Sequence, residues 1–207
     1  MDIVIATTNL GKLKEYREML EKYSVNCLSL KDINFDVEIV EDGNTFKENS
    51  YIKAKAISDY TNLPVIADDS GLSVDALGGL PGIYSARFSG LEHNDKANRL
   101  KLIDELHKLN LSESKAHFTC AITYINNGEV IQTEGYVYGK VIDKEIGSNG
   151  FGYDSMFIPD GYNTTVGEID EDSKNNISHR HNALIKLIEV LFKWERLYLV
   201  IHMEVLI

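Results

Sequence analysis

The sequence contains few cysteines, no long apolar run and no excess of basic residues, and each absence excludes a class of protein. The two cysteines, Cys27 and Cys120, provide neither a disulfide framework nor the Cys-x-x-Cys spacing of a zinc or redox site. We interpret both as small hydrophobic residues in strands, in a protein of the reducing cytoplasm. The apolar segment at residues 3–6 is too short for a signal peptide or a membrane span.

The balance of charge is acidic: 21 basic and 32 acidic residues give a net charge of −11. This argues against a protein that coats nucleic acid, because such a protein needs a basic face to displace counterions. We therefore expect neither nucleic acid nor a membrane as a partner. A small polyanionic ligand stays compatible with the charge if a divalent cation bridges carboxylate and phosphate groups, so the composition favours a metal.

Predicted strands and helices alternate along the chain, which is typical of an α/β protein. Strands are expected at residues 3–6, 25–30, 64–67 and 156–158, and residues 118–125 and 130–141 flank an Asn-Asn-Gly-Glu turn as an antiparallel hairpin. Helices are expected after residue 12 and over residues 45–60, 95–108 and 181–193. We predict one domain with a mixed sheet, folded as two lobes around a cleft.

The spacing of apolar residues also predicts the buried helix faces. The residues expected to face inward are Leu13, Tyr16 and Leu20 in the first helix, Ala97, Leu100, Ile103 and Leu106 in the third, and Leu184, Leu187, Ile188 and Leu191 in the last. Thr45 and Glu48 have the spacing of a capping box at the start of the second helix.

Two adjacent carboxylates, Asp68 and Asp69, follow the predicted strand at residues 64–67. In α/β sheets, ligands gather beyond the carboxyl ends of strands. Magnesium commonly takes one or two carboxylates together with substrate phosphate oxygens. Ser70 and Gly71 complete a sequence that is equally typical of a plain capped turn, so the local residues leave both interpretations open.

The loop at residues 7–12 connects a predicted strand to a predicted helix, so its backbone N–H groups can meet an anion. Thr7, Thr8 and Asn9 add side-chain donors, and Lys12 adds a positive charge. The loop lacks the first glycine and the final serine or threonine of a Walker A motif. Ordinary capping of the helix explains the same residues.

A small acidic cluster, Glu38, Glu41 and Asp42, precedes Gly43. A solvated turn explains it, and a second metal ligand beside Asp69 is the sharper hypothesis. Glu41 is then the preferred ligand, although Glu38 and the helix-capping Glu48 are alternatives.

Two later segments have the composition of a nucleotide site. The glycine-rich loop at residues 147–154 carries Phe151, which is placed to stack on a planar base, and Asp154, which can accept hydrogen bonds. A tight hairpin with a core phenylalanine is the alternative. Residues 178–181, Ser-His-Arg-His, bring three potential cations to a helix start, with Lys174 nearby; helix capping by the serine explains part of this pattern.

Taken together, these segments resemble the noncanonical purine nucleoside triphosphate pyrophosphatases, also called the inosine/xanthosine triphosphate pyrophosphatase family. The matching motifs, in chain order, are TTNLGK at 7–12, EDGNTFKEN at 41–49, ADDSGL at 67–72, GGLPGIYSAR at 78–87, GFGYD at 150–154 and KNNISHR at 174–180. The resemblance implies an elongated α/β domain at residues 1–193 with a nucleotide in its cleft. It also implies Mg²⁺-dependent hydrolysis of ITP, dITP and XTP to monophosphate and pyrophosphate by a cytoplasmic homodimer.

The resemblance also assigns residues. Asp69 is implied as the catalytic carboxylate and as a Mg²⁺ ligand together with Glu41, whereas Asp68 has no implied role. The implied substrate-binding residues are Thr7, Thr8, Asn9, Leu10, Gly11, Lys12, Ser70, Phe151, Gly152, Tyr153, Asp154, Lys174, His179 and Arg180. Donors such as Arg180, His179 and backbone N–H groups would pair with a purine 6-carbonyl and reject the amino group of adenine.

Three features depart from the family pattern. Ser155 and Met156 follow the Gly-Tyr-Asp motif where proline and an aliphatic residue are usual, and Val40 stands where many members have a second glutamate. The tail at residues 194–207 is longer and more apolar than the family leads us to expect. An added strand, an interface element or an altered reading frame would each account for it. A related pyrophosphatase of the septum-inhibitor type and a non-hydrolysing nucleotide sensor are the rival functions.

Overall fold

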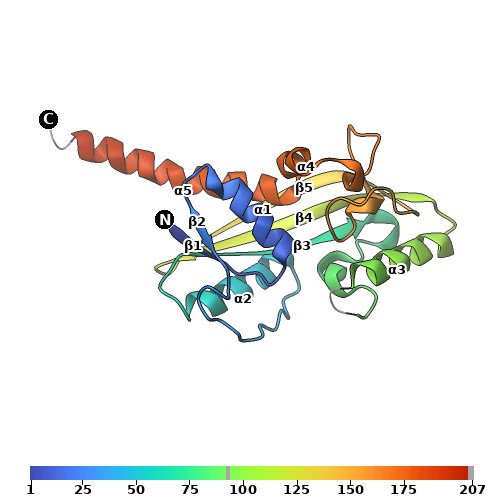
Figure 1. Cartoon of the computed structure of the whole chain (residues 1–207), viewed down its shortest axis with the longest axis horizontal. Helices are drawn as coiled ribbons and strands as arrows, with labels where there is room; N and C mark the ends of the chain where they lie inside the picture. Colours follow the sequence, from blue (N-terminus) through green and yellow to red (C-terminus); the bar gives the residue numbers. More distant parts are fainter. Residues whose placement is uncertain (92–93, 205–207) are drawn as a thin grey trace.

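The computed structural model describes residues 1–91 and 94–204, whose backbone forms one mixed sheet with helices on both faces (Figure 1). The strands are β1 (Asp2–Ile5), β2 (Asn26–Leu28), β3 (Val65–Val74), β4 (Glu113–Asn126), β5 (Glu129–Ile142) and β6 (Phe157–Pro159). The α-helices are α1 (Leu10–Glu21), α2 (Phe46–Ser58), α3 (Asp95–Lys108), α4 (Glu171–Ile177) and α5 (His179–Glu204). Short 3-10 helices η1 (Asp75–Leu77), η2 (Gly82–Arg87), η3 (Asp154–Met156) and η4 (Val166–Glu168) lie in the connections.

The six strands lie in the order β2-β1-β3-β4-β5-β6. β1 pairs in parallel with both β2 and β3, whereas the remaining neighbours pair antiparallel. This arrangement confirms the predicted α/β class with a mixed sheet.

The hydrophobic core is divided along the length of the sheet. Near β1, one cluster packs α1 and α5 against one face, and a second packs α2 against the other. A third cluster, which includes Leu72, Leu102 and Phe157, lies at the far ends of β3, β4 and β5. The long strands therefore run through two lobes, as Figure 1 shows. Asp68 and Asp69 occupy the part of β3 between them, since Ile66 belongs to the first cluster and Leu72 to the third.

Local sequence accounts for the main helix starts and the hairpin. The Asn9 side chain accepts hydrogen bonds from two N–H groups in the first turn of α1, and the Thr45 side chain accepts one from Glu48 at the start of α2. The Glu48 carboxylate accepts from Asn44 N at 2.6 Å, so only half of the predicted capping box forms. Asn127 and Gly128, both with positive φ, close the tight turn between β4 and β5.

The predicted end of the third strand was wrong. β3 continues to Val74 and pairs Asp68 with Ile122 and Asp69 with Ala121 of β4. The neighbour that stops is β1, whose last residue, Ile5, pairs with Ile66. The two carboxylates thus lie beyond the end of a parallel neighbour, inside a strand that its antiparallel neighbour continues to pair.

The third helix has the predicted bounds, and of its predicted inward residues Leu106 is buried and Ile103 packs against the core, whereas Leu100 does not. Leu100 is 52% exposed, whereas Leu102 and Leu106 are fully buried with Asn98. Residues at three-residue steps drift around a helix that has 3.6 residues per turn, so the four-residue pair defines the core face instead.

The last helix was predicted with the correct inward residues but a late start. α5 begins at His179, directly after the unpredicted α4, and buries Leu184, Leu187 and Ile188. Its backbone stays helical through Glu204, which excludes the added-strand interpretation of the tail. The tail side chains and residues 205–207 lie outside the described part, so an interface role stays a prediction. Over the described residues, no helix is both long and apolar enough to cross a bilayer.

Candidate active site

The two adjacent carboxylates of β3 point to opposite faces of the sheet, as successive strand residues do. Asp68 faces α1 and α5, where it contacts Lys12 and Arg180. Asp69 faces α2, where it accepts a hydrogen bond from Asn49. The prediction of a single acidic turn is replaced by two separate environments, one on each face.

Asp68 lies at the centre of a buried cluster of charges. Its Oδ2 atom is 2.9 Å from Lys12 Nζ and 3.3 Å from Arg180 Nη2, and only 1% of the side chain is exposed. Burial alone would raise the pKa of Asp68, but the two cations outweigh it and hold the pKa well below its usual range. The carboxylate therefore stays ionised and serves to position two basic side chains.

Asp69 has the opposite electrostatic balance. Its Oδ2 atom accepts from Asn49 Nδ2 at 3.1 Å, and its Oδ1 atom accepts from the N–H of Ser70 at 3.0 Å. Burial raises its pKa; Lys12 and Lys53 only partly offset this, and Glu41 adds to the rise. The two neighbouring carboxylates therefore differ in their surroundings: cations dominate around Asp68, whereas burial dominates at Asp69.

Among the three acidic candidates for a second metal ligand, the structure brings Glu41 toward Asp69. Glu41 contacts Lys53 at 2.8 Å, and its charge acts on Asp69. Glu38 is exposed, and the Glu48 carboxylate caps the backbone of Asn44. Glu41 is therefore the candidate of the three that the fold places near Asp69.

The first loop and the glycine-rich loop lie against each other. A Cβ atom added to Gly11 would stand 3.1 Å from Cδ1 of Phe151, so the absence of a side chain permits the approach. The Asn9 side chain caps α1, and Thr7 Oγ1 accepts a hydrogen bond from Asn9 N at 3.1 Å. Thr8 and Leu10 are exposed beside them. Both the capping and the site-forming interpretations of this loop are compatible with this arrangement.

A buried residue that sequence reasoning missed, Glu15 of α1, joins these parts. Its carboxylate contacts the guanidinium of Arg180 and lies 3.0 Å from Lys174 Nζ. Lys174 Nζ is also 2.9 Å from Asp154 Oδ2 and 4.6 Å from the centre of the Phe151 ring. The sequence feature that could have identified Glu15 is its position next to Tyr16, on the buried face of a predicted helix. An alternating chain of charges thus connects the first loop to the glycine-rich loop.

The glycine-rich loop is fixed by hydrogen bonds within the loop and to α3 and η2. Asp154 Oδ2 accepts from the N–H of Phe151 at 2.9 Å, and Gly150 has φ of +78°. The backbone of Gly152 bonds to Asp95 and Arg99 of α3. Tyr153 turns into the core, is 4% exposed and donates its hydroxyl to Ser85 O. The side chain of Tyr153 therefore supports the loop and does not face the candidate site.

The prediction of three cations at the start of α5 was wrong for the histidines. The His179 ring stacks on Phe118 with centroids 4.9 Å apart. Desolvation, followed by repulsion from Arg180, lowers the pKa of His179 well below its usual value. Desolvation also lowers the pKa of His181. Arg180 alone carries charge there, and its side chain is 1% exposed, with one Nη2 bond of 3.2 Å to Ser70 Oγ.

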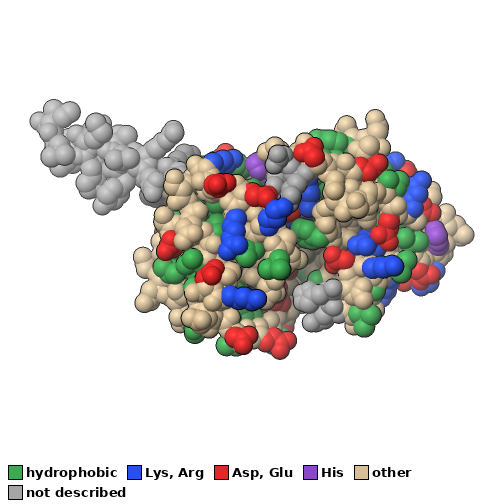
Figure 2. All heavy atoms as spheres, viewed as in Figure 1, with side chains coloured by type: hydrophobic (Ala, Val, Ile, Leu, Met, Phe, Trp, Pro, Cys, Tyr) green, Lys and Arg blue, Asp and Glu red, His purple; other side chains and the backbone are tan. Residues whose placement is uncertain are grey.

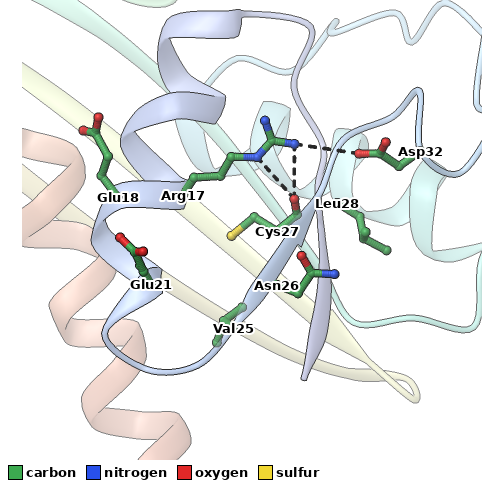
Figure 3. A pocket seen from close by; sticks show the side chains of 8 residues that line it. All are labelled: Arg17, Glu18, Glu21, Val25, Asn26, Cys27, Leu28 and Asp32. Atoms are coloured by element: carbon green, nitrogen blue, oxygen red, sulfur yellow. Dashed lines mark hydrogen bonds and ion pairs between the residues drawn. The ribbon is translucent and has the colours of Figure 1, made fainter.

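A cavity of about 580 Å³ lies away from these residues, between α1 and β2 (Figure 3). Its main polar groups already satisfy each other. Arg17 donates to the carbonyl of Cys27 and pairs with Asp32, as the dashed lines in Figure 3 show. The charged and polar residues of the candidate active site instead surround the middle of β3. Acidic and basic side chains are interspersed over the face shown in Figure 2, which is indented between the two lobes.

Comparisons with known proteins identify the family of this chain. The model of the Ham1 family matches residues 3–190. A dITP/XTP pyrophosphatase of Nautilia profundicola is 47% identical over 196 residues, covering 93% of this chain and 98% of the relative. One of Bacillus subtilis is 45% identical, covering 92% and 96%. The solved HAM1 protein of Coxiella burnetii superposes with a TM-score of 0.84 at 35% identity, covering 93% of this chain and 99% of that one. The resemblance seen in the motifs is confirmed, and the chain belongs to the Ham1 family.

Proposed function

We propose that this chain is a dITP/XTP pyrophosphatase that hydrolyses dITP, XTP and ITP to the monophosphate and pyrophosphate in a Mg²⁺-dependent reaction. The observation that carries the proposal is the near-complete match to relatives that bear this name, over 93% of this chain. The contrast between Asp68 and Asp69 supplies the chemistry, because one carboxylate is held ionised among cations and the other has a raised pKa. Removal of deaminated purines from the nucleotide pool is the expected role.

The residues present suit magnesium. Glu41 and Asp69 offer the hard carboxylate oxygens that Mg²⁺ prefers, and the Lys53 ammonium beside them shows that the fold favours positive charge there. Within the described ranges, no group of three or more His, Cys, Asp or Glu residues could hold a metal ion. Two carboxylates would therefore hold it, with phosphate oxygens and water as the other ligands. When bound, Mg²⁺ would neutralise charge on the triphosphate.

The chain's own residues account for the remaining chemistry. Asp69 would accept a proton from the attacking water. Lys12, held by Asp68 at the start of α1, would place its positive charge near the phosphates. Phosphoryl-type transfer depends mainly on such positioning and charge neutralisation.

Base selection is assigned differently from the sequence-based expectation. The guanidinium of Arg180 binds Glu15, Asp68 and Ser70. Arg180 is therefore assigned to holding these residues in place and not to binding the base. A neutral His179 still has an N–H that can donate to a purine 6-carbonyl. The Phe151 ring, with Lys174 over it, provides a stacking surface for the base.

The proposed assembly is a cytoplasmic homodimer. Across β3, β4 and β5, Ser73, His117 and Tyr138 occupy one register line, so their side chains share one face of the sheet. Tyr138 is 59% exposed and its ring lies 5.4 Å from that of His117. A second copy that covered these rings would remove exposed aromatic surface from water. Sedimentation of the purified chain tests this, since a monomer at micromolar concentration would contradict it.

The activity is tested by pyrophosphate release from dITP, XTP and ITP with Mg²⁺, compared with dATP and a methylated pyrimidine triphosphate. Fast release is expected from the first three and little from dATP. Each buried hydrogen bond that adenine leaves unmade costs about 1–3 kcal/mol, or roughly tenfold or more in rate. Orthophosphate as the first product would refute a pyrophosphatase. Preference for the pyrimidine would favour the septum-inhibitor type, and tight binding without turnover would favour a sensor.

A further inference from the structure

Lys53 of α2 places an ammonium group at the carboxylates proposed to hold magnesium. Its Nζ atom is 2.8 Å from Glu41 Oε2 and donates to the carbonyl oxygen of Asp68 at 3.1 Å. Only 13% of its side chain is exposed. The charge of Asp69 also acts on it. A cation that belongs to the chain therefore lies among the acidic groups proposed to hold the metal.

The position of this ammonium group has an electrostatic reason. Glu41 and Asp69 repel each other, and Glu41 contributes to the raised pKa of Asp69. The ammonium group of Lys53 lies 2.8 Å from Glu41 and bonds to the backbone of Asp68, next to Asp69 in the chain. Lys53 is thus charged and compensates the two acidic side chains. Glu41 lies in a segment without regular secondary structure, and Lys53 fixes its carboxylate there.

We propose that Lys53 is a tethered competitor of magnesium, a positioning residue that holds Glu41 in the metal-free protein and must release it when the metal binds. This rests on the proposed function, because it takes Glu41 and Asp69 as the metal ligands. A divalent ion and an ammonium group on the same carboxylate repel strongly at such short range. The flexible lysine stem lets the group move while it keeps the Asp68 carbonyl as an acceptor.

The consequence is that the metal binds weakly alone and tightly with the triphosphate. Two carboxylates are few ligands for Mg²⁺, and Lys53 makes the cost of binding it higher. The negative charge of a polyphosphate compensates both cations at once. Metal and nucleotide are then taken up together, which avoids filling the site with an idle metal ion.

Binding of Mn²⁺ alone, measured from the electron paramagnetic resonance signal of the free ion, tests the proposal without reference to activity. Lys53→Met should bind Mn²⁺ at least about tenfold more tightly than the unmodified chain. Lys55→Met is the matched control, because Lys55 lies on the same helix but pairs with Asp59 and has 48% of its side chain exposed. Its Mn²⁺ affinity should be unchanged. Lys53→Arg keeps the charge and should leave the affinity low.

An Mn²⁺ affinity that is unchanged or weaker in Lys53→Met would overturn the proposal, provided that its thermal unfolding shows a folded protein. Lys53→Gln gives the same test if the methionine variant does not fold. Glu41→Gln should weaken Mn²⁺ binding. If it has no effect, the metal site itself is misplaced and this proposal falls with it, whereas pyrophosphate release from dITP would still decide the proposed activity separately.

Discussion

Replacement of each neighbouring carboxylate of β3 by asparagine is expected to affect stability in different ways. Asp68→Asn removes the negative charge shared by Lys12 and Arg180, whose guanidinium is 1% exposed. Breaking a buried ion pair by removing one partner costs about 3–5 kcal/mol. Arg180 keeps Glu15 as a second partner, so the lower limit, about 3 kcal/mol, is the expected loss in the free energy of unfolding. For a chain of this size that corresponds to a fall in melting temperature of about 6–12 °C.

Asp69→Asn should have little effect on stability or a slight stabilising effect. The raised pKa of Asp69 means that its charged form is held less favourably in the folded protein than in the unfolded chain. Neutralisation at pH 7 relieves this cost, while the loss of one acceptor for Asn49 or Ser70 offsets part of the gain. Pyrophosphate release should nearly vanish in the same variant, because the proposed base is gone.

Urea unfolding of the two variants and the unmodified chain at pH 7 measures the difference. The pH dependence of stability gives an independent check. The pKa of Asp68 in the folded protein lies below its ordinary value of 3.8. Asp68 therefore contributes to the free energy of unfolding above pH 3.8, and this contribution is lost as the pH falls below 3.8. The difference in the free energy of unfolding between Asp68→Asn and the unmodified chain should therefore become smaller below about pH 4. Equal losses in both variants, or a loss below about 1 kcal/mol in Asp68→Asn, would refute the assignment of roles.

Three further predictions concern other parts of the molecule. Leu102→Ala should cost about 2–5 kcal/mol in urea unfolding and Leu100→Ala less than about 0.5, because Leu102 is fully buried and Leu100 is 52% exposed; similar losses would contradict the observed face of α3. Gly150→Ala should raise the KM for dITP, since the residue has φ of +78° and a Cβ atom would stand 2.1 Å from Asp154 Oδ2; an unchanged KM would separate this loop from the substrate. Burial raises the pKa of Cys27 to about 11, so its alkylation rate, followed by mass spectrometry, should still rise between pH 9 and pH 10; a plateau by pH 9 would contradict this.

The sequence allowed the outline of the molecule to be predicted because its signals are local. The Asn-Asn-Gly-Glu turn determines the hairpin of β4 and β5, and the apolar residues of α5 identify its inward face. The six motifs identified the family because their order is specific. The length of β3 could not be predicted from local sequence. β3 continues past Ala67 only because β4, more than 40 positions later, pairs with it through Val74.

The role of Asp68 depends on contacts that no local pattern encodes. Its partner Arg180 lies 112 positions away, and the contact between Arg180 and Glu15 spans 165 positions. The neutral state of His179 likewise follows from its packing against Phe118 and from the charge of Arg180. Residue identity indicated which groups could be charged, and only their surroundings decided which ones are.

The continuity of β3, β4 and β5 through both lobes limits how the molecule can deform. Because β4 pairs with β3 over the whole length of β3, a hinge at a single residue between the lobes would break hydrogen bonds of this ladder. Movement of one lobe relative to the other is therefore expected as a gradual bend of the shared strands, together with changes in the loops and in side chains such as Lys53. The two lobes would then move as parts of one sheet, so a change at one lobe is transmitted through the same strands that carry Asp68 and Asp69.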